Sequence, residues 1–349
     1  MVTAKIAGIG AALPPSYDQD QLWHDVFQWH FSRSRVAQRI FSAAGVQSRH
    51  SAVDPAEFAA VADSSTAERM RRYGELAPPL GLRAVQDALA AAETDADEIG
   101  LLAVATCTGY RTPGLDIALA EALPLRADAR RLLIGHTGCH AALPTLATIA
   151  DYVEVHRRPA VMLCLELTSL HIQPASIDPG QMVSHALFGD AAAALVLTPN
   201  DGPAPGLRVA DIASRTDTGR SDQMTWDITD LGFRMGLSPE VPDALAEQVG
   251  PLLKDLLGRH GHDLTDVYGW AVHPGGPRIL EAVEETLGLH PTALAASRKV
   301  LAEHGNCSSG TVLLVLREIL AAGAPTGPIV ALAFGPGLTL YAALLEPDR

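Results

Sequence analysis

Apolar positions in this chain recur in blocks whose spacing alternates between that of strands and that of helices. Apolar runs predict strands at residues 4–11, 100–106, 131–134 and 160–167. Helical spacing predicts helices at residues 18–31, 34–44, 66–92, 116–123 and 141–156. We expect the strand at 131–134 to be buried, and the helix at 66–92 to break or bend at Pro78 and Pro79. This alternation indicates an α/β fold.

A segment rich in proline and glycine, residues 199–206, divides the chain. We place the domain boundary there, between an N-terminal half at residues 1–199 and a C-terminal half at residues 200–349. Just before the boundary, residues 183–197 form an apolar stretch with a tight turn at Gly189-Asp190. In the C-terminal half, helical spacing predicts a helix at residues 242–260. Apolar runs predict strands at residues 208–214, 226–235, 267–272 and 329–334.

The second half repeats the plan of the first. In each half a helix and an acidic turn precede an apolar strand, which ends at Thr106-Cys107 in one half and at His273-Pro274 in the other. Further on, Gly138-Cys139 opens one helix and Gly305-Asn306 opens the matching one. This internal similarity predicts two duplicated α/β halves. Ligands of such sheets bind beyond the carboxyl ends of the strands, where these motifs place their cysteine, histidine and asparagine.

Composition excludes several classes of protein. The chain has 349 residues, of which 48% are apolar and 19% charged, as is typical of a globular protein. Its net charge of −14, without a basic stripe carrying aromatics, argues against a nucleic-acid partner. Residues 6–13 are cut by glycines and lack the features of a signal peptide, and no apolar run is long enough to enter a membrane as a span. The four cysteines show no metal-ligand spacing, so we expect no metal site and a cytoplasmic location.

One basic cluster stands out in this acidic chain. It consists of Arg33, Arg35, Arg39 and Arg49, which lie just before, within and after the second predicted helix. Such a cluster is usually a solvated helix face, but it could equally hold a phosphorylated ligand. The residues alone leave both interpretations open.

Cys139 is the candidate nucleophile, because it lies between small residues where a strand gives way to a helix. Unpaired N–H groups and the helix dipole at such a place favour a thiolate and could hold an oxyanion. The alternative is a small core residue, which is the commoner fate of a free cysteine. His273 and Asn306 could each be structural as well, as a core histidine and a helix cap. Together, at equivalent places in the two halves, the three form a set that could catalyse acyl transfer.

Six motifs resemble those of type III polyketide synthases of the chalcone synthase type, within the thiolase and ketoacyl synthase superfamily. They are Gly138-Cys139, the segments 108–114, 186–190 and 273–277, and the segments 305–309 and 334–338. The resemblance covers nearly the whole chain. It implies a thiolase-like five-layered α-β-α-β-α fold built from two duplicated halves, and a homodimer. It implies no metal and no cofactor, since CoA thioesters are the substrates.

The resemblance also implies a mechanism and a set of site residues. Cys139 would carry an acyl group taken from an acyl-CoA starter, and His273 and Asn306 would decarboxylate malonyl-CoA to an enolate that attacks the thioester. Repetition would build a poly-β-keto chain that cyclises to an aromatic or pyrone product. Negative charge then develops on a thioester oxygen, which an amide and an imidazole can receive. Substrate-binding roles are implied for Phe188, Met235, Cys107, His171, Ser308, Phe334 and Arg39.

Several of these residues depart from the family pattern. Phe188 matches a gatekeeper aromatic, whereas Met235 stands where the family has a second gatekeeper phenylalanine. Cys107 and His171 replace two cavity threonines of the plant enzymes. Arg39 matches a position that binds CoA phosphate, but its basic neighbours in the family are absent here. These differences bear on starter size and chain length.

Two alternatives to iterative condensation remain at this stage. One is a ketoacyl synthase III-like enzyme that makes a single condensation with an extender from acyl carrier protein. The other is a protein that binds thioesters or transfers acyl groups without condensing them. A malonyl-CoA decarboxylation assay would separate the last from both condensing enzymes.

Overall fold

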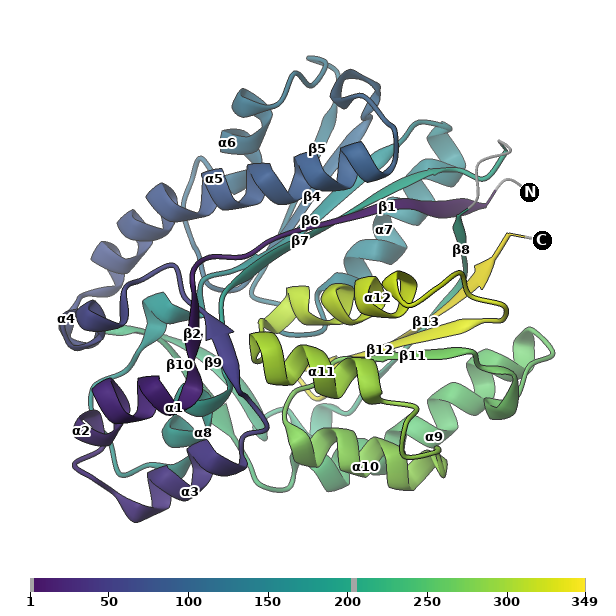
Figure 1. The fold of residues 1–349 in the computed structure, drawn as a ribbon. Helices are drawn as coiled ribbons and strands as arrows, with labels where there is room; N and C mark the ends of the chain where they lie inside the picture. The colour runs from purple at the N-terminus through teal and green to yellow at the C-terminus, as the bar shows by residue number, and fades with distance from the viewer. Residues whose placement is uncertain (1–2, 202–205, 349) are drawn as a thin grey trace.

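The computed structural model describes residues 3–201 and 206–348 and contains one large mixed sheet (Figure 1). Nine strands form it in the order β11-β12-β13-β8-β1-β7-β6-β4-β5. The N-terminal half supplies β1 (Ala4–Ala12), β4 (Leu101–Thr106), β5 (Arg130–Gly135), β6 (Ala160–Glu166) and β7 (Ala191–Pro199). The C-terminal half supplies β8 (Leu207–Thr216), β11 (Gly269–Val272), β12 (Ile329–Gly335) and β13 (Thr339–Pro347). The two parts meet where Lys5 and Ile6 of β1 pair with Arg208 and Leu207 of β8.

Helices lie in three layers around the two parts of the sheet (Figure 1). The long helix α5 (Thr66–Ala91) and the short α6 (Leu115–Ala122) cover the outer face of the first part. Two helices, α7 (Ala142–His156) and α12 (Thr311–Ala321), lie between the parts. The outer face of the second part is covered by α9 (Val241–Arg259), on which α10 (Pro277–Leu287) packs. Three buried apolar clusters correspond to these helical layers, which gives the α-β-α-β-α sandwich.

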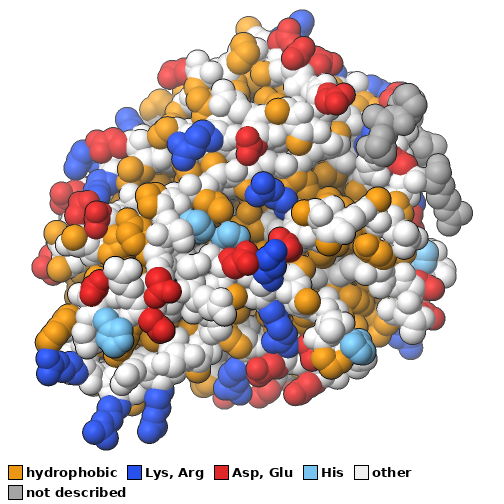
Figure 2. Space-filling view, viewed as in Figure 1, with side chains coloured by type: hydrophobic (Ala, Val, Ile, Leu, Met, Phe, Trp, Pro, Cys, Tyr) orange, Lys and Arg blue, Asp and Glu red, His pale blue; other side chains and the backbone are white. Residues whose placement is uncertain are grey.

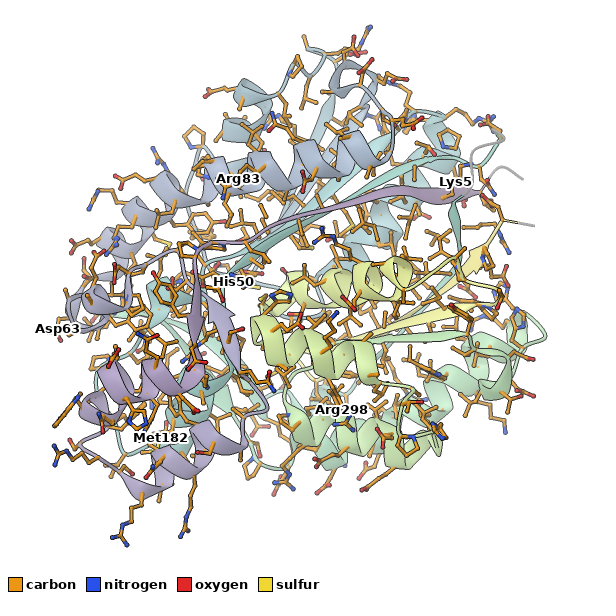
Figure 3. The ribbon with its side chains drawn as sticks, viewed as in Figure 1. Lys5, His50, Asp63, Arg83, Met182 and Arg298 are labelled. Atoms are coloured by element: carbon orange, nitrogen blue, oxygen red, sulfur yellow. The ribbon has the colours of Figure 1, made fainter. Side chains whose placement is uncertain are left out.

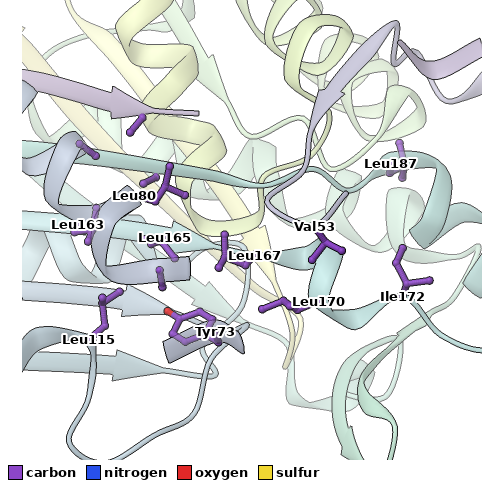
Figure 4. Close-up of a cluster of buried hydrophobic side chains, with 14 of the residues drawn as sticks. Val53, Tyr73, Leu80, Leu115, Leu163, Leu165, Leu167, Leu170, Ile172 and Leu187 are labelled. Atoms are coloured by element: carbon purple, nitrogen blue, oxygen red, sulfur yellow. The ribbon is translucent and has the colours of Figure 1, made fainter. Parts of the chain in front are cut away.

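The central strands β4 and β6 are apolar up to their last residues, Thr106 and Glu166, because helices cover both of their faces. Every residue of β4 and β6 is buried. Figure 4 shows Leu163 and Leu165 of β6 packed near Tyr73 and Leu80 of α5. Glycines allow the same helix to approach β1 closely, since a Cβ at Gly10 would lie 2.2 Å from the backbone nitrogen of Ala88.

A lobe outside the sandwich covers the ends of the strands, at the lower left of Figure 1. It contains the helices α1 (Gln19–Leu22), α2 (Gln28–His30), α3 (Arg35–Ala43), α4 (Phe58–Asp63) and α8 (Pro179–Leu187). It also contains the short pair β2 (Ser16–Asp18) and β3 (Ser48–His50), and the hairpin of β9 (Met224–Thr229) and β10 (Gly232–Leu237). The remaining helix, α11 (Ala295–His304), packs beside β3.

Several predicted elements differ from those observed. β5 is an edge strand paired with β4 alone, and its residues are exposed or half-buried, so the expectation of a buried strand was wrong. Residues 226–235 form a hairpin instead of one strand, because Asp230-Leu231 makes a turn within them. Residues 183–187 are helical and belong to α8. Pro78 and Pro79 lie inside one continuous helix.

The predicted boundary at 199–206 falls between β7 and β8, and residues 202–205 lie outside the described part of the chain. Residues 18–31 contain α1 and α2 joined by a π-helical turn at Trp23–Phe27. Among the described residues, no helix combines the length and the apolar character needed to cross a bilayer.

Candidate active site

A cavity of about 630 Å³ brings together the residues singled out in the two halves. Cys139, His273 and Asn306 all line it. So do Phe188, Met235 and Phe334, whose implied substrate contacts therefore lie at the same place. The rest of the lining is mostly apolar and comes from α3, α8, the β9–β10 hairpin and the first turns of α9 and α10. Such a mixture of apolar walls and few polar groups is typical of a site for an organic ligand.

Cys139 lies in the turn between β5 and α7 and is only 7% exposed. The preceding residue, Gly138, has a φ of +93°, and a Cβ there would lie 2.4 Å from the ring of Pro336. Only glycine fits both constraints at low cost, so the turn aims the thiol at the cavity through a specific backbone.

The thiol of Cys139 is protonated at neutral pH in the free protein. Burial raises its pKa to about 11, although a hydrogen bond with Ser308 acts in the opposite direction. The prediction that a helix start would favour a thiolate was therefore wrong. Cys139 lies two residues before the N-cap, Ala141, and its burial disfavours the charged thiolate.

His273 follows β11 and is 1% exposed. Its backbone N–H donates to the carbonyl of Leu332 at 2.8 Å, which extends the pairing of β11 with β12. Burial, and secondarily His140, lower its pKa to about 3, so the imidazole is neutral at neutral pH. Its Nδ1 is buried and has no hydrogen-bond partner among the described residues. A neutral imidazole can accept a proton or donate one N–H, as acyl transfer requires.

Asn306 has an amide whose orientation is fixed by its neighbours. Its Oδ1 accepts the backbone N–H of Ser308 at 2.9 Å and the hydroxyl of Thr311 at 3.5 Å. Its Nδ2 donates to the carbonyl of Gly275 at 3.4 Å. Since an amide nitrogen carries two hydrogens, one remains for a ligand in the cavity.

Behind the thiol lies a buried carboxylate that sequence reasoning missed, Glu166. It accepts from the backbone N–H of Cys107 at 2.9 Å, and from the hydroxyls of Thr108 at 2.8 Å and Ser309 at 2.5 Å. The thiol of Cys107 donates to it at 3.2 Å and lies 3.8 Å from the hydroxyl of Ser308. Burial raises the pKa of Glu166. The carboxyl thus organises the side chains that surround Cys139.

Cys107 and Ser308 line a second void of about 20 Å³ that also touches Cys139, Phe188 and Met235. His171 lines a third void, of about 30 Å³, behind Phe188. Both ring nitrogens of His171 are engaged, with the carbonyl of Thr108 at 2.8 Å and the N–H of Phe233 at 2.9 Å. His171 thus lies outside the lining of the main cavity, and its contact with substrate stays a prediction.

Trp226 is a second residue that sequence reasoning missed. It lines both small voids, and its indole N–H donates to the carbonyl of Cys107 at 2.7 Å. In the hairpin it pairs directly with Met235. A correct assignment of the turn at residues 230–231 would have placed the two side by side from the sequence.

The charged residues at the cavity are few. Asp178 is engaged by Arg234 at 2.9 Å, whereas Arg278, at the start of α10, is exposed. Arg39 is exposed on α3, one residue before Ile40, which lines the cavity. Arginine side chains project over α2 and α3 at the lower left of Figure 2. No group of His, Cys, Asp and Glu suited to a metal ion occurs among residues 3–201 and 206–348.

Two sequence models, for chalcone and stilbene synthases, match this arrangement: the N-terminal domain over residues 46–202 and the C-terminal domain over residues 216–347. The chain belongs to the chalcone and stilbene synthase family. The "alpha-pyrone synthesis polyketide synthase-like Pks18" of Mycobacterium tuberculosis is 33% identical over 331 residues, which are 91% of this chain and 83% of the relative. The 1,3,6,8-tetrahydroxynaphthalene synthase of Streptomyces peucetius subsp. caesius is 33% identical over 351 residues, 98% of this chain and 92% of the relative.

A solved structure gives the same family and fold. PKS-I from the brown alga Ectocarpus siliculosus superposes with a TM-score of 0.93 at 29% identity, covering 100% of this chain and 99% of the other. The type III polyketide synthase resemblance and the thiolase-like fold are thereby confirmed. The ketoacyl synthase III-like alternative is not favoured, because these relatives are polyketide synthases.

Proposed function

We propose that this type III polyketide synthase loads an acyl-CoA starter on Cys139 and extends it with malonyl-CoA by decarboxylative Claisen condensation. The observation that carries the proposal is the cavity of about 630 Å³ in which a thiol, a neutral imidazole and an oriented amide meet. The test is incubation with malonyl-CoA and a panel of acyl-CoA starters, followed by mass spectrometry of the products. Decarboxylation without chain growth in every arm would contradict it.

Acyl loading uses the thiol of Cys139 and the imidazole of His273. The imidazole of His273, which burial keeps neutral, accepts the thiol proton in concert with the attack of the Cys139 sulfur on the starter thioester. The bond between the acyl carbon and the CoA sulfur breaks, and the departing thiolate takes the proton back. The mostly apolar walls of the cavity disfavour bound water, which protects the new thioester from hydrolysis.

Decarboxylation uses the hydrogen-bond donors of Asn306 and His273. The malonyl thioester oxygen receives hydrogen bonds from the Asn306 amide and the His273 imidazole, so that charge developing on it is stabilised as carbon dioxide leaves. The resulting enolate carbon attacks the acyl carbon on Cys139, a carbon–carbon bond forms, and the Cys139 sulfur is released. The predominantly apolar lining favours the loss of carbon dioxide, because the malonyl carboxylate is poorly hydrated there.

The side chains that line the cavities limit the type of starter and the number of extensions. The long cavity is apolar, which suits an aliphatic starter chain. The void on the Cys107 side of Cys139 is small, about 20 Å³, and Trp226 lines both it and the neighbouring void of about 30 Å³. We therefore propose few extensions and a pyrone product, in line with the name of the Mycobacterium relative. A naphthalene product, as in the name of the Streptomyces relative, would need more room there.

We further propose a cytoplasmic homodimer that uses free CoA thioesters and no cofactor. The unpaired edge of β5 supports the dimer, because Leu133 on it is 43% exposed. Tyr110, whose ring lies 5.4 Å from that of His136 just after β5, is 67% exposed. The four free cysteines support a reducing compartment. Light scattering tests the dimer, and equal rates with malonyl-CoA and malonyl-carrier protein would contradict the preference for free CoA.

A further inference from the structure

Arg49 is a buried cation to which the proposed chemistry gives no role. It lies in β3, next to His50, which Figure 3 labels, and only 5% of its surface is exposed. Burial lowers the pKa of its guanidinium to about 9, while the carboxyl of Asp190 acts in the opposite direction. A charge so placed costs free energy unless its contacts stabilise it.

The contacts of Arg49 lie at the end of α8. Its Nη1 donates to two backbone carbonyls, those of His185 and Phe188, the second at 3.0 Å. The guanidinium also lies over the rings of Phe27, at 5.1 Å, and Phe41, at 5.9 Å. Aromatic faces thus hold the cation on one side while the carbonyls attract it on the other.

The segment that Arg49 holds is joined to Asn306 by two backbone hydrogen bonds. The N–H of Asn306 donates to the carbonyl of Leu187 at 2.8 Å, and the N–H of Gly189 donates to the carbonyl of Asn306 at 3.0 Å. Phe188, between them, lines the main cavity and both small voids. One buried cation therefore fixes the main chain that carries Phe188 and supports Asn306.

Close packing leaves this segment little freedom. A Cβ at Gly189 would lie 2.4 Å from the carbonyl of His304 and 3.3 Å from the Cβ of Arg49. A Cβ at Gly305 would lie 2.6 Å from the carbonyl of Leu187 and 3.5 Å from the same Arg49 atom. The segments that carry Phe188 and Asn306 thus touch each other and the stem of Arg49, so a shift of one moves the other.

We propose that Arg49 is a positioning residue for condensation, which holds the main chain of residues 187–189 so that the Asn306 amide and the Phe188 ring stay in place for decarboxylation. The proposal rests on the proposed function. Arg49 touches no reacting atom and acts through this segment. Its Nη1 serves both carbonyls while the planar guanidinium lies over the rings of Phe27 and Phe41. A lysine ammonium, on a shorter stem and without a planar face, reproduces this arrangement less well.

Arg69 provides a matched control. It is also fully buried, and its guanidinium also donates to backbone carbonyls, those of Ser64, Ala62, Leu170 and Ile172. None of these belongs to residues 187–189 or to Asn306. Arg69→Met therefore removes a buried cation of the same kind without releasing the segment that supports Asn306.

The experiment compares Arg49→Met, Arg49→Lys and Arg69→Met with the parent protein. We expect Arg49→Met to lower kcat for malonyl-CoA decarboxylation by about tenfold or more, since small displacements of catalytic groups have such effects. The KM for malonyl-CoA and the rate of Cys139 alkylation should change much less. Arg49→Lys should recover part of kcat, and Arg69→Met should lose thermal stability while keeping the parent kcat.

Amide hydrogen exchange tests the support of residues 187–189 by Arg49 without an activity assay. Peptides that contain residues 187–189 and 305–307 should exchange faster in Arg49→Met but not in Arg69→Met. Unchanged exchange there, an unchanged kcat in Arg49→Met, or an equal loss of kcat in Arg69→Met would overturn the proposal. A parent protein that neither decarboxylates nor condenses would instead refute the proposed function, and the exchange comparison would still decide the role of Arg49.

Discussion

At the scale of the residue, the site consists of neutral groups whose charges appear only during reaction. Cys139 is a thiol with a pKa of about 11 and His273 an imidazole with a pKa of about 3, both because they are buried. Asn306 lines the cavity, and its Oδ1 and Nδ2 are held by Ser308 and Gly275. Such a site stabilises charge that develops in the transition state more than charge in the ground state.

Removing either donor should slow decarboxylation without unfolding the protein. We expect His273→Ala and Asn306→Ala each to lower the rate of malonyl-CoA decarboxylation by about a hundredfold or more, because each deletes one hydrogen bond to the developing oxyanion. Acyl loading of Cys139 should survive better in Asn306→Ala, since its amide takes no proton. Decarboxylation at the parent rate in the asparagine variant would show that the amide has another role.

Trp226 should set the length of the product. Trp226→Ala removes the indole that lines both voids, of about 20 and 30 Å³, so more extensions should precede release. Met235→Phe is the opposing variant, which should narrow the cavity and disfavour long starters. Product profiles under equal malonyl-CoA supply provide the measurement. Identical profiles in parent and Trp226→Ala would mean that the wall is remote from the growing chain.

Motif spacing places Cys139, His273 and Asn306 at strand ends in a duplicated chain, and the structure brings all three to one cavity. The sequence did not predict Trp226, Glu166 or Arg49, whose roles depend on contacts between segments far apart in the sequence. Glu166, for example, meets Cys107 and Ser309 across 59 and 143 positions. The pKa of Cys139 was also missed, because a helix start is visible in a sequence and burial at a cavity wall is not.

At the scale of the element, helix α5 and strand β1 approach each other through glycines. Gly10→Ala should destabilise the protein by about 1–3 kcal/mol, since inserting an atom into a packed contact forces the backbone to move. The new Cβ would lie 2.2 Å from the nitrogen of Ala88 and 2.4 Å from the carbonyl of Ala84. Thermal unfolding measures the change.

Gly258→Ala is the matched control. Gly258 lies in the last turn of α9, where a new Cβ meets no atom within 4 Å. There alanine should raise stability by up to about 1 kcal/mol, through its higher helix propensity. Equal effects of the two substitutions would refute the close approach of α5 to β1.

Elements with strong local patterns were predicted well, and those defined by their partners were not. The uninterrupted apolar runs of β4 and β6 and the helices α7 and α9 were recognised within a few residues of their ends. The apolar stretch 131–134 has a similar composition, yet β5 is an edge strand, because position in the sheet is a property of the whole fold. The hairpin was missed because its turn, Asp230-Leu231, lacks glycine at those positions.

At the scale of the molecule, buried histidines should make stability depend on pH. Burial lowers the pKa of His171, His185 and His273 to about 3 and that of His140 and His304 to about 4, from 6.5 in the unfolded chain. Between these values the unfolded chain binds more protons, so the free energy of unfolding falls as pH falls below about 6.5. The raised pKa values of the Glu166 and Asp190 carboxyls make the free energy of unfolding rise as pH falls. We expect the five histidines to outweigh these two carboxyls.

The melting temperature measured from about pH 8 to pH 5 tests this balance. It should be nearly constant above pH 7 and should decline below about 6.5. A melting temperature that rises on acidification would mean that the buried carboxyls outweigh the histidines.

The central claim is that Cys139 carries a chain that grows by decarboxylation of malonyl-CoA. The most direct measurement is mass spectrometry of both protein and products after incubation with an aliphatic acyl-CoA and malonyl-CoA, in the parent and in Cys139→Ala. The account predicts an acyl adduct on Cys139 and products longer than the starter by successive two-carbon units in the parent, and neither in the variant. An adduct on Cys164 with Cys139 unmodified, or extended products from Cys139→Ala, would contradict it.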